Sequence, residues 1–324
     1  MSIAVVAFAS PIHGEGYVKG RFLEVKSRIP EALGPFHNAE EAPELKPKAL
    51  VAVTLTGGTS AAVVEYARRI GVRRVLAVGT HQHNGAASAL SAKSLLESEG
   101  IRAWAFLGSP DRDLGSAVEV AKRVAEAVAV LTSPRVLLIG RRTAQADRFA
   151  AKFGGVVEVM GLDEFADLVE RSKPDPRFVS TFGDEELSRI YSALKSLRGY
   201  DGIALTCFPF IMKRGLTPCL ALSLMNSEGD LVACEGDLQA LTAMIISRSL
   251  TGFSGWIANV VYARSEEAFF AHCTLALNMA RTWRLMPHFE TGRPYGLAAT
   301  LAHREYTGVS VGPLFDKMAV GVST

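Results

Sequence analysis

Short apolar runs alternate with amphipathic stretches along the first part of the chain. The runs are apolar at nearly every position, and the stretches between them repeat apolar residues at helical spacing, so that Val63, Tyr66 and Ala67 share one face. Strands that are apolar throughout and separated by helices are typical of a parallel sheet covered on both sides. The predicted strands are 3–10, 49–55, 73–80 and 101–109, and the predicted helices are 57–71, 86–100 and 113–131.

The same alternation starts again after Ser133 and Pro134, which predicts a second α/β unit. Beyond residue 252 the pattern changes to short extended runs divided by turn residues, which is typical of an antiparallel β domain. The predicted fold class is therefore α/β, with two Rossmann-like or flavodoxin-like parallel-sheet units followed by a C-terminal antiparallel β domain. The predicted domains are 1–132, 133–252 and 253–324, with a loop at 172–180.

Composition narrows the function classes. The 324 residues are 48% hydrophobic, which is enough for two or three cores. A net charge of +2 argues against a nucleic-acid binder, and no apolar stretch approaches the ~18 residues of a membrane helix. We expect a cytoplasmic protein whose four cysteines, none in a CxxC pair, are reduced and most simply inert buried thiols.

Polar residues follow two strands of the first unit. The Gly-rich segment 55–62 resembles a turn that can hold a ligand on free N–H groups, although a purely structural turn is favoured. His81, His83 and Asn84 follow the next strand, at the carboxyl edge where ligands collect in open α/β folds. We take these three as candidate substrate-binding residues, with ordinary loop polarity as the alternative.

A second group of polar residues lies in the second half of the chain. Glu235 follows an apolar strand in the sequence CEGD, and Asp237 is suited to cap the helix that begins after it. Asn259 and His272 each interrupt an apolar run. A carboxylate, an amide oxygen and an imidazole together suit a hard divalent cation. The alternative is that each is a core residue satisfied by its own hydrogen bonds.

His288 and Glu290 flank a predicted turn and are expected to point into the same cavity, unless the turn is simply solvated. Cys207 follows a strand, but no base for a nucleophilic cysteine can be assigned from the order of residues.

The order of these motifs resembles the L-fucose isomerase and L-arabinose isomerase superfamily. The resemblance rests mainly on CEGD and the helix after it, and more weakly on the segments 256–263, 271–274 and 288–301 and on TGGT, HNGAASAL and CFP. It implies two flavodoxin-like units, a β-rich C-terminal domain and a sugar isomerase that uses Mn²⁺ or a similar ion. It also implies a homo-oligomer, trimer or hexamer, in which a neighbouring subunit's N-terminal unit completes each active site.

Carried over by motif, Glu235 matches the first acid, which binds the metal and transfers a proton, and His272 matches a histidine ligand. The second acid is replaced by Asn259, whose amide can bind a metal but cannot take up a proton. Glu290 or Asp237 is then the substitute, and we select Glu290 as the second catalytic residue and His288 as a further sugar-binding residue. A sugar-binding protein without turnover, and a related lyase or isomerase with another substrate, remain the alternatives.

Overall fold

A computed structural model describes residues 2–111 and 113–323, and the chain divides into two compact units, Met1–Val130 and Leu131–Thr324. The boundary predicted between 132 and 133 lies two residues after this division. The boundary predicted between 252 and 253 falls inside the second unit, so the C-terminal β segments belong to the same compact body as the second sheet.

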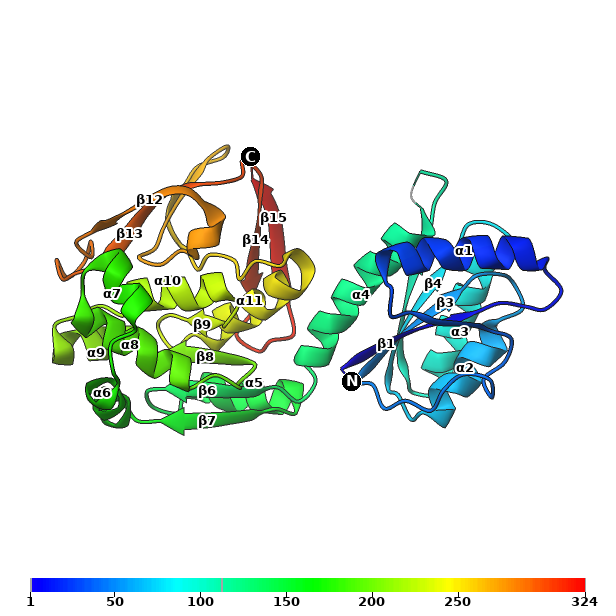
Figure 1. Cartoon of the computed structure of the whole chain (residues 1–324), viewed down its shortest axis with the longest axis horizontal. Helices are drawn as coiled ribbons and strands as arrows, with labels where there is room; N and C mark the ends of the chain where they lie inside the picture. The colour runs from blue at the N-terminus through cyan, green and yellow to red at the C-terminus, as the bar shows by residue number, and fades with distance from the viewer. Residues whose placement is uncertain (1, 112, 324) are drawn as a thin grey trace. The chain divides into compact units, whose positions relative to one another are not determined.

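The first unit contains a parallel sheet of five strands in the order β2-β1-β3-β4-β5 (Figure 1). This is the flavodoxin-like order, in which β2 lies on one side of β1 and the later strands lie on the other. Helices α1 and α4 cover one face, and α2 and α3 cover the other, as the apolar pattern predicted. The elements are β1 (Ile3–Phe8), α1 (Glu15–Arg28), β2 (Leu33–Phe36), β3 (Ala49–Thr54), α2 (Ser60–Arg69), β4 (Arg74–Gly79), α3 (Gly85–Ser98), β5 (Arg102–Leu107) and α4 (Leu114–Val130).

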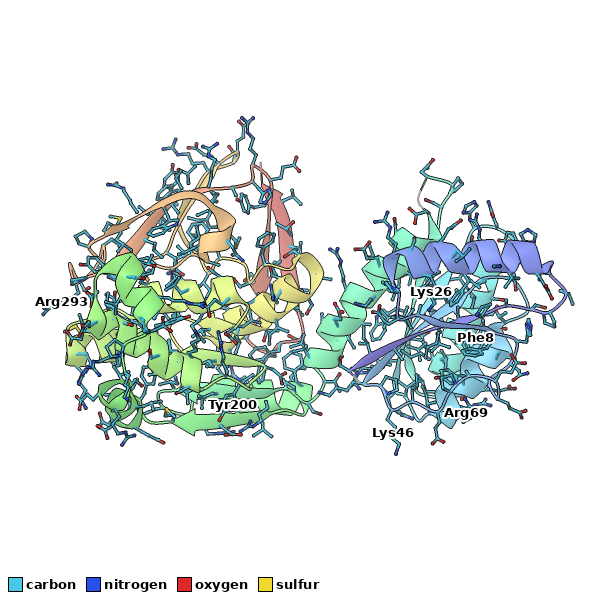
Figure 2. The ribbon with its side chains drawn as sticks, in the orientation of Figure 1. Phe8, Lys26, Lys46, Arg69, Tyr200 and Arg293 are labelled. Atoms are coloured by element: carbon cyan, nitrogen blue, oxygen red, sulfur yellow. The ribbon has the colours of Figure 1, made fainter. Side chains whose placement is uncertain are left out.

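Aromatic packing joins this sheet to the helices. Phe8, labelled in Figure 2, is fully buried at the end of β1, and its ring centroid lies 5.7 Å from that of Tyr66 on α2. Tyr66 remains satisfied because its hydroxyl donates to the carbonyl of Pro43 at 2.9 Å. The side chain that gave α2 its apolar periodicity is therefore a core residue of the unit.

The second unit begins with a parallel sheet of four strands in the order β7-β6-β8-β9, which repeats the arrangement of the first four strands of the other unit. The restart predicted after Pro134 is thus confirmed. The elements are β6 (Arg135–Ile139), α5 (Ala144–Phe153), β7 (Val156–Met160), α6 (Leu162–Arg171), α7 (Pro176–Phe182), α8 (Glu185–Ser196), β8 (Gly202–Leu205), α9 (Cys207–Arg214), α10 (Cys219–Glu228), β9 (Val232–Ala233) and α11 (Leu238–Thr251).

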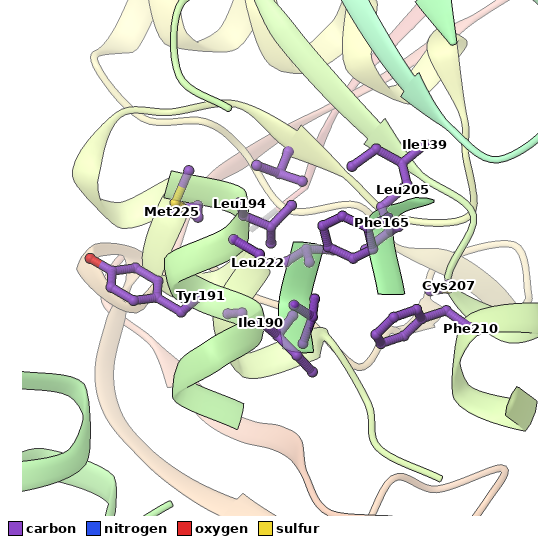
Figure 3. Packing of buried hydrophobic residues seen from close by; sticks show 14 of the residues in the cluster. Ile139, Phe165, Ile190, Tyr191, Leu194, Leu205, Cys207, Phe210, Leu222 and Met225 are labelled. Carbon is purple, nitrogen blue, oxygen red and sulfur yellow. The ribbon is translucent and has the colours of Figure 1, made fainter. Parts of the chain in front are cut away.

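The core of this unit lies between the sheet and helices α6, α8, α9 and α10. Figure 3 shows Phe165, Leu205 and Phe210 within it, with Cys207 next to Phe210 where α9 begins. Because β8 pairs in parallel with β9, the end of β8 lies beside the turn that carries Glu235, and the N–H of Gly236 donates to the carbonyl of Leu205 at 2.9 Å.

The prediction of a loop at 172–180 is correct for residues 172–175 and wrong for the rest, because α7 occupies Pro176–Phe182. Asp175 is the N-cap and accepts hydrogen bonds from the backbone N–H groups of Arg177 and Phe178, at 3.0 and 3.1 Å. Pro176 takes the first helical position, where its missing N–H costs nothing. The residues that looked like loop punctuation are thus the start signal of a short helix.

The C-terminal segment forms three separate antiparallel hairpins (Figure 1). They are β10 (Asn259–Ala263) with β11 (Ala268–Ala271), β12 (Ala280–Met286) with β13 (Gly296–Leu301), and β14 (Tyr306–Val311) with β15 (Met318–Ser323); a 3₁₀ turn spans Leu277–Met279. The expected antiparallel class is confirmed. The expectation that Asn259 interrupts a buried strand is not, because it is the first residue of a strand that is exposed throughout.

No helix within residues 2–111 and 113–323 is long and apolar enough to cross a lipid bilayer.

Candidate functional site

Glu235 lies in a tight turn between β9 and α11. The N–H of Asp237 donates to the carbonyl of Cys234 at 3.1 Å, and the two residues between them have positive φ angles, 60° at Glu235 and 68° at Gly236. A Cβ on Gly236 would lie only 2.7 Å from the hydroxyl of Thr206, so this position also requires glycine for space. The backbone therefore bends sharply at Glu235 and Gly236.

Asp237 is the N-cap of α11, as predicted. Its Oδ1 accepts from the N–H groups of Gln239 at 2.8 Å and Ala240 at 3.1 Å, and from the side-chain amide of Gln145 at 3.0 Å. These hydrogen bonds engage Oδ1 in capping α11, whereas Glu235 makes no such capping contact and is the carboxylate we consider for other chemistry.

Glu235 faces His272. Its Oε1 lies 3.6 Å from His272 Nε2, and the Glu235 side chain is 44% exposed while that of His272 is 3% exposed. Burial disfavours charge on the imidazole, but its interactions with Cys273 and the charge of Glu235 outweigh burial and raise the pKa of His272. The result is an accessible carboxylate paired with a buried imidazole.

A non-glycine residue with positive φ is held at a cost, and such residues cluster at functional sites. Glu235 carries this conformation with its carboxylate directed toward His272 rather than into a cap. The turn therefore places the Glu235 carboxylate near His272 at a cost in local stability.

All four cysteines are buried, and they gather behind this pair. The sulfurs of Cys207 and Cys234 are 3.2 Å apart. Cys273 contacts the thiols of Cys219 and Cys234, and its sulfur lies 3.7 Å from His272 Nδ1. Sequence spacing could not show this cluster, because its members come from four separate segments.

Contacts among the thiols shift the pKa values of individual cysteines in opposite directions. Hydrogen bonds from Cys219 and Cys234 lower the pKa of Cys273 far below the ordinary thiol range, with burial opposing and His272 assisting. The same hydrogen bond to Cys273, together with burial, raises the pKa of Cys219. Within the cluster the pKa of Cys273 is thus held low, and the pKa of the neighbouring His272 is raised.

His288 joins the thiols, while Glu290 does not. His288 is 1% exposed, and one of its ring nitrogens lies within 4.8 Å of the sulfurs of Cys219 and Cys273. Its Nδ1 is 3.3 Å from the hydroxyl of Thr291. Glu290, two residues further on, is exposed in the turn between β12 and β13.

Asn259 is exposed at the start of β10 and pairs in register with Ala271, the residue before His272. The backbone thus brings its segment beside His272.

His81, His83 and Asn84 belong to the first unit and follow β4. The carbonyl of His83 accepts from the N–H of Gly57 at 2.6 Å, so this loop and the Gly-rich turn lie together at the carboxyl edge of the sheet. The His83 ring centroid lies 3.9 Å from that of Tyr17, and His81 lines a surface depression of about 320 Å³. The two polar motifs of the first unit therefore form one loop cluster.

The cysteine cluster was missed because each cysteine was considered alone. The usable signal was position: Cys207 and Cys234 both follow strands of one parallel sheet, and the carboxyl ends of parallel strands meet at one edge.

No protein-family model matches the chain, and no curated protein matches it.

Proposed function

We propose that the protein is a metal-dependent aldose–ketose isomerase-like enzyme acting on a small carbohydrate, as the resemblance to the L-fucose and L-arabinose isomerases implies. The supporting observation is the 3.6 Å separation between Glu235 Oε1 and His272 Nε2, with the carboxylate exposed on a strained turn. A carboxylate and an imidazole at this separation are compatible with two ligands of one ion.

Glu235 and His272 Nε2 would hold the cation, and Asn259 would add an amide oxygen from the neighbouring strand. Oxygen-rich ligands of this kind suit Mn²⁺ better than a thiophilic metal. Such an ion would supply Lewis-acid polarisation of the sugar's carbonyl and adjacent hydroxyl.

The protein's own part is to move a proton between two neighbouring carbons. Glu235 can take the proton next to the carbonyl because its carboxylate is exposed and not engaged in helix capping. Removal of that proton gives an enediolate, and the isomerisation is complete when the neighbouring carbon takes up a proton and the hydroxyl proton passes from one oxygen to the other. Asn259 cannot share this task, so we assign the second proton transfer to Glu290, which is exposed in the turn between β12 and β13.

Sugar recognition is assigned to His81, His83 and Asn84, supplied by a neighbouring subunit of a homo-oligomer. His288 does not take part in sugar recognition, because a side chain that is 1% exposed and packed among thiols has no free surface for a sugar.

The first test uses Mn²⁺-loaded protein and a panel of aldoses and ketoses. Glu235→Gln keeps the size of the side chain but removes its charge. We therefore expect this variant to lose bound Mn²⁺, as measured by electron paramagnetic resonance, and to lose the interconversion of aldose and ketose. Glu164→Gln removes an exposed carboxylate on α6 and is the matched control. Full metal content and turnover in Glu235→Gln would rule out the assignment.

A sugar-binding protein without turnover is the second candidate, and the observation that favours it is the amide at Asn259. In that case calorimetry would detect sugar binding while no sugar in the panel is converted.

A further inference from the structure

A second set of side chains is arranged like a metal site, and it does not include Glu235. Cys219 begins α10, Cys273 follows β11, and His288 follows β12. Their sulfur and nitrogen atoms all lie within 4.8 Å of one another, and all three residues are buried.

We infer that Cys219, Cys273 and His288 form a binding site for a thiophilic divalent cation, of which Zn²⁺ is the best representative. This inference is independent of the proposed isomerase function.

The composition of the cluster supports this over inert packing. A buried cysteine ordinarily behaves as a small hydrophobe among apolar neighbours. Here Cys273 instead contacts two further thiols and an imidazole, and His288 adds a second imidazole. Sulfur and imidazole nitrogen are the ligands that structural zinc prefers, whereas Mn²⁺ prefers oxygen.

His288 has the surroundings of a zinc ligand. Metal-binding histidines usually have their second ring nitrogen held by a hydrogen bond, which fixes the orientation of the ring. The hydroxyl of Thr291, 3.3 Å from Nδ1, can hold that nitrogen, in which case Nε2 would be the nitrogen that binds the metal.

A tetrahedral ion needs a fourth ligand. Cys234 contacts Cys273, but its sulfur does not lie within 4.8 Å of both Cys219 and His288, so a water would take the fourth position. Cys234 also belongs to a competing set, Cys234, His272 and Cys273, whose ligand atoms lie within the same distance limit. The two sets share Cys273, so their histidines distinguish them.

A cation here would have a structural effect. It would join the start of α10 to the segments after β11 and β12, which belong to two hairpins with no shared sheet. We therefore expect zinc to raise the thermal midpoint of the protein as well as to bind.

The experiment uses the full chain, purified with reduced thiols, stripped of metal and dialysed against Zn²⁺, and against Co²⁺ as a spectroscopic probe. We expect one Zn²⁺ per chain, thiolate-to-cobalt charge-transfer absorption, and a rise in thermal midpoint. Cys219→Ala and His288→Gln should each lose the bound zinc, the cobalt band and the rise in midpoint. Circular dichroism of each metal-free variant establishes that it is folded.

Cys207→Ser is the matched control, because Cys207 is equally buried but belongs to neither set among the described residues. It should bind zinc as the wild type does. The inference is overturned if the wild type binds no zinc, if Cys207→Ser loses it as fully as Cys219→Ala, or if His272→Gln abolishes binding while His288→Gln does not. Glu235→Gln should keep its zinc, so loss of isomerase activity and loss of this site are separate results.

Discussion

Glu235 combines an exposed carboxylate with a backbone conformation that residues with a side chain rarely adopt. The residue after it is a glycine for which the same conformation is easy, and the residue after that caps a helix. Of these three residues, Glu235 is the one whose backbone conformation is unfavourable for its residue type. That mismatch favours a functional role for its side chain.

Replacing Glu235 with glycine should therefore stabilise the protein. The left-handed conformation costs a non-glycine residue about 1–2 kcal/mol, and glycine's greater freedom in the unfolded chain offsets about 0.4–1 kcal/mol of the relief. We expect a net gain of about 0.5–1 kcal/mol in the free energy of unfolding, measured by urea denaturation, together with loss of Mn²⁺ binding.

Ser133→Gly is the control for this prediction, since Ser133 also has a positive φ, 54°, but lies outside the site. It should gain stability and leave Mn²⁺ binding unchanged. A destabilised Glu235→Gly, or one that still binds Mn²⁺, would contradict the view that strain is accepted here for function.

Among the elements, α11 depends most directly on one side chain of the site. Asp237 accepts hydrogen bonds from two backbone N–H groups at the start of α11 and from the side chain of Gln145. Asp237→Ala should lower the free energy of unfolding by about 1 kcal/mol, and Asp237→Asn should recover most of that loss because an amide oxygen still accepts. The measurement is equilibrium denaturation in urea, and equal stability of Asp237→Ala and wild type would show that the cap contributes nothing.

Element by element, the parts predicted best were those whose own residues determine them. The strands β1, β3 and β4 are buried on both faces, so their apolar runs were unambiguous. Helix α7 was missed because its start signal, Asp175 and Pro176, is made of the same residue types as a loop. The hairpins were predicted as strands, but their exposure depends on what packs against them, which local pattern does not contain.

The site residues, like the helices and strands, were predictable where their own local sequence pointed to them. Glu235 and His272 were chosen because each contradicted its local pattern, and the structure brings them together. The cysteines did not depart from their local sequence pattern, because a buried cysteine is common in a protein core. Only the fold shows that Cys219, Cys234 and Cys273 meet.

At the scale of the whole molecule, the chain consists of two compact units whose sheets share the same order for four strands. Glu235, Asn259, His272 and the thiol cluster all belong to the second unit, and the loops carrying His81, His83 and Asn84 belong to the first. In the isomerase proposal, the second unit of one subunit would supply the metal ligands and the proton transfer, and the first unit of a neighbouring subunit would supply sugar recognition.

The most direct test of the isomerase proposal is exchange of hydrogen at carbon. The Mn²⁺-loaded protein would be incubated with each sugar of the panel in heavy water, and deuterium at C1 and C2 followed by nuclear magnetic resonance. We predict incorporation into at least one sugar by the wild type and none by Glu235→Gln. A sugar that binds without any exchange, or equal exchange by the variant, would contradict proton transfer by Glu235.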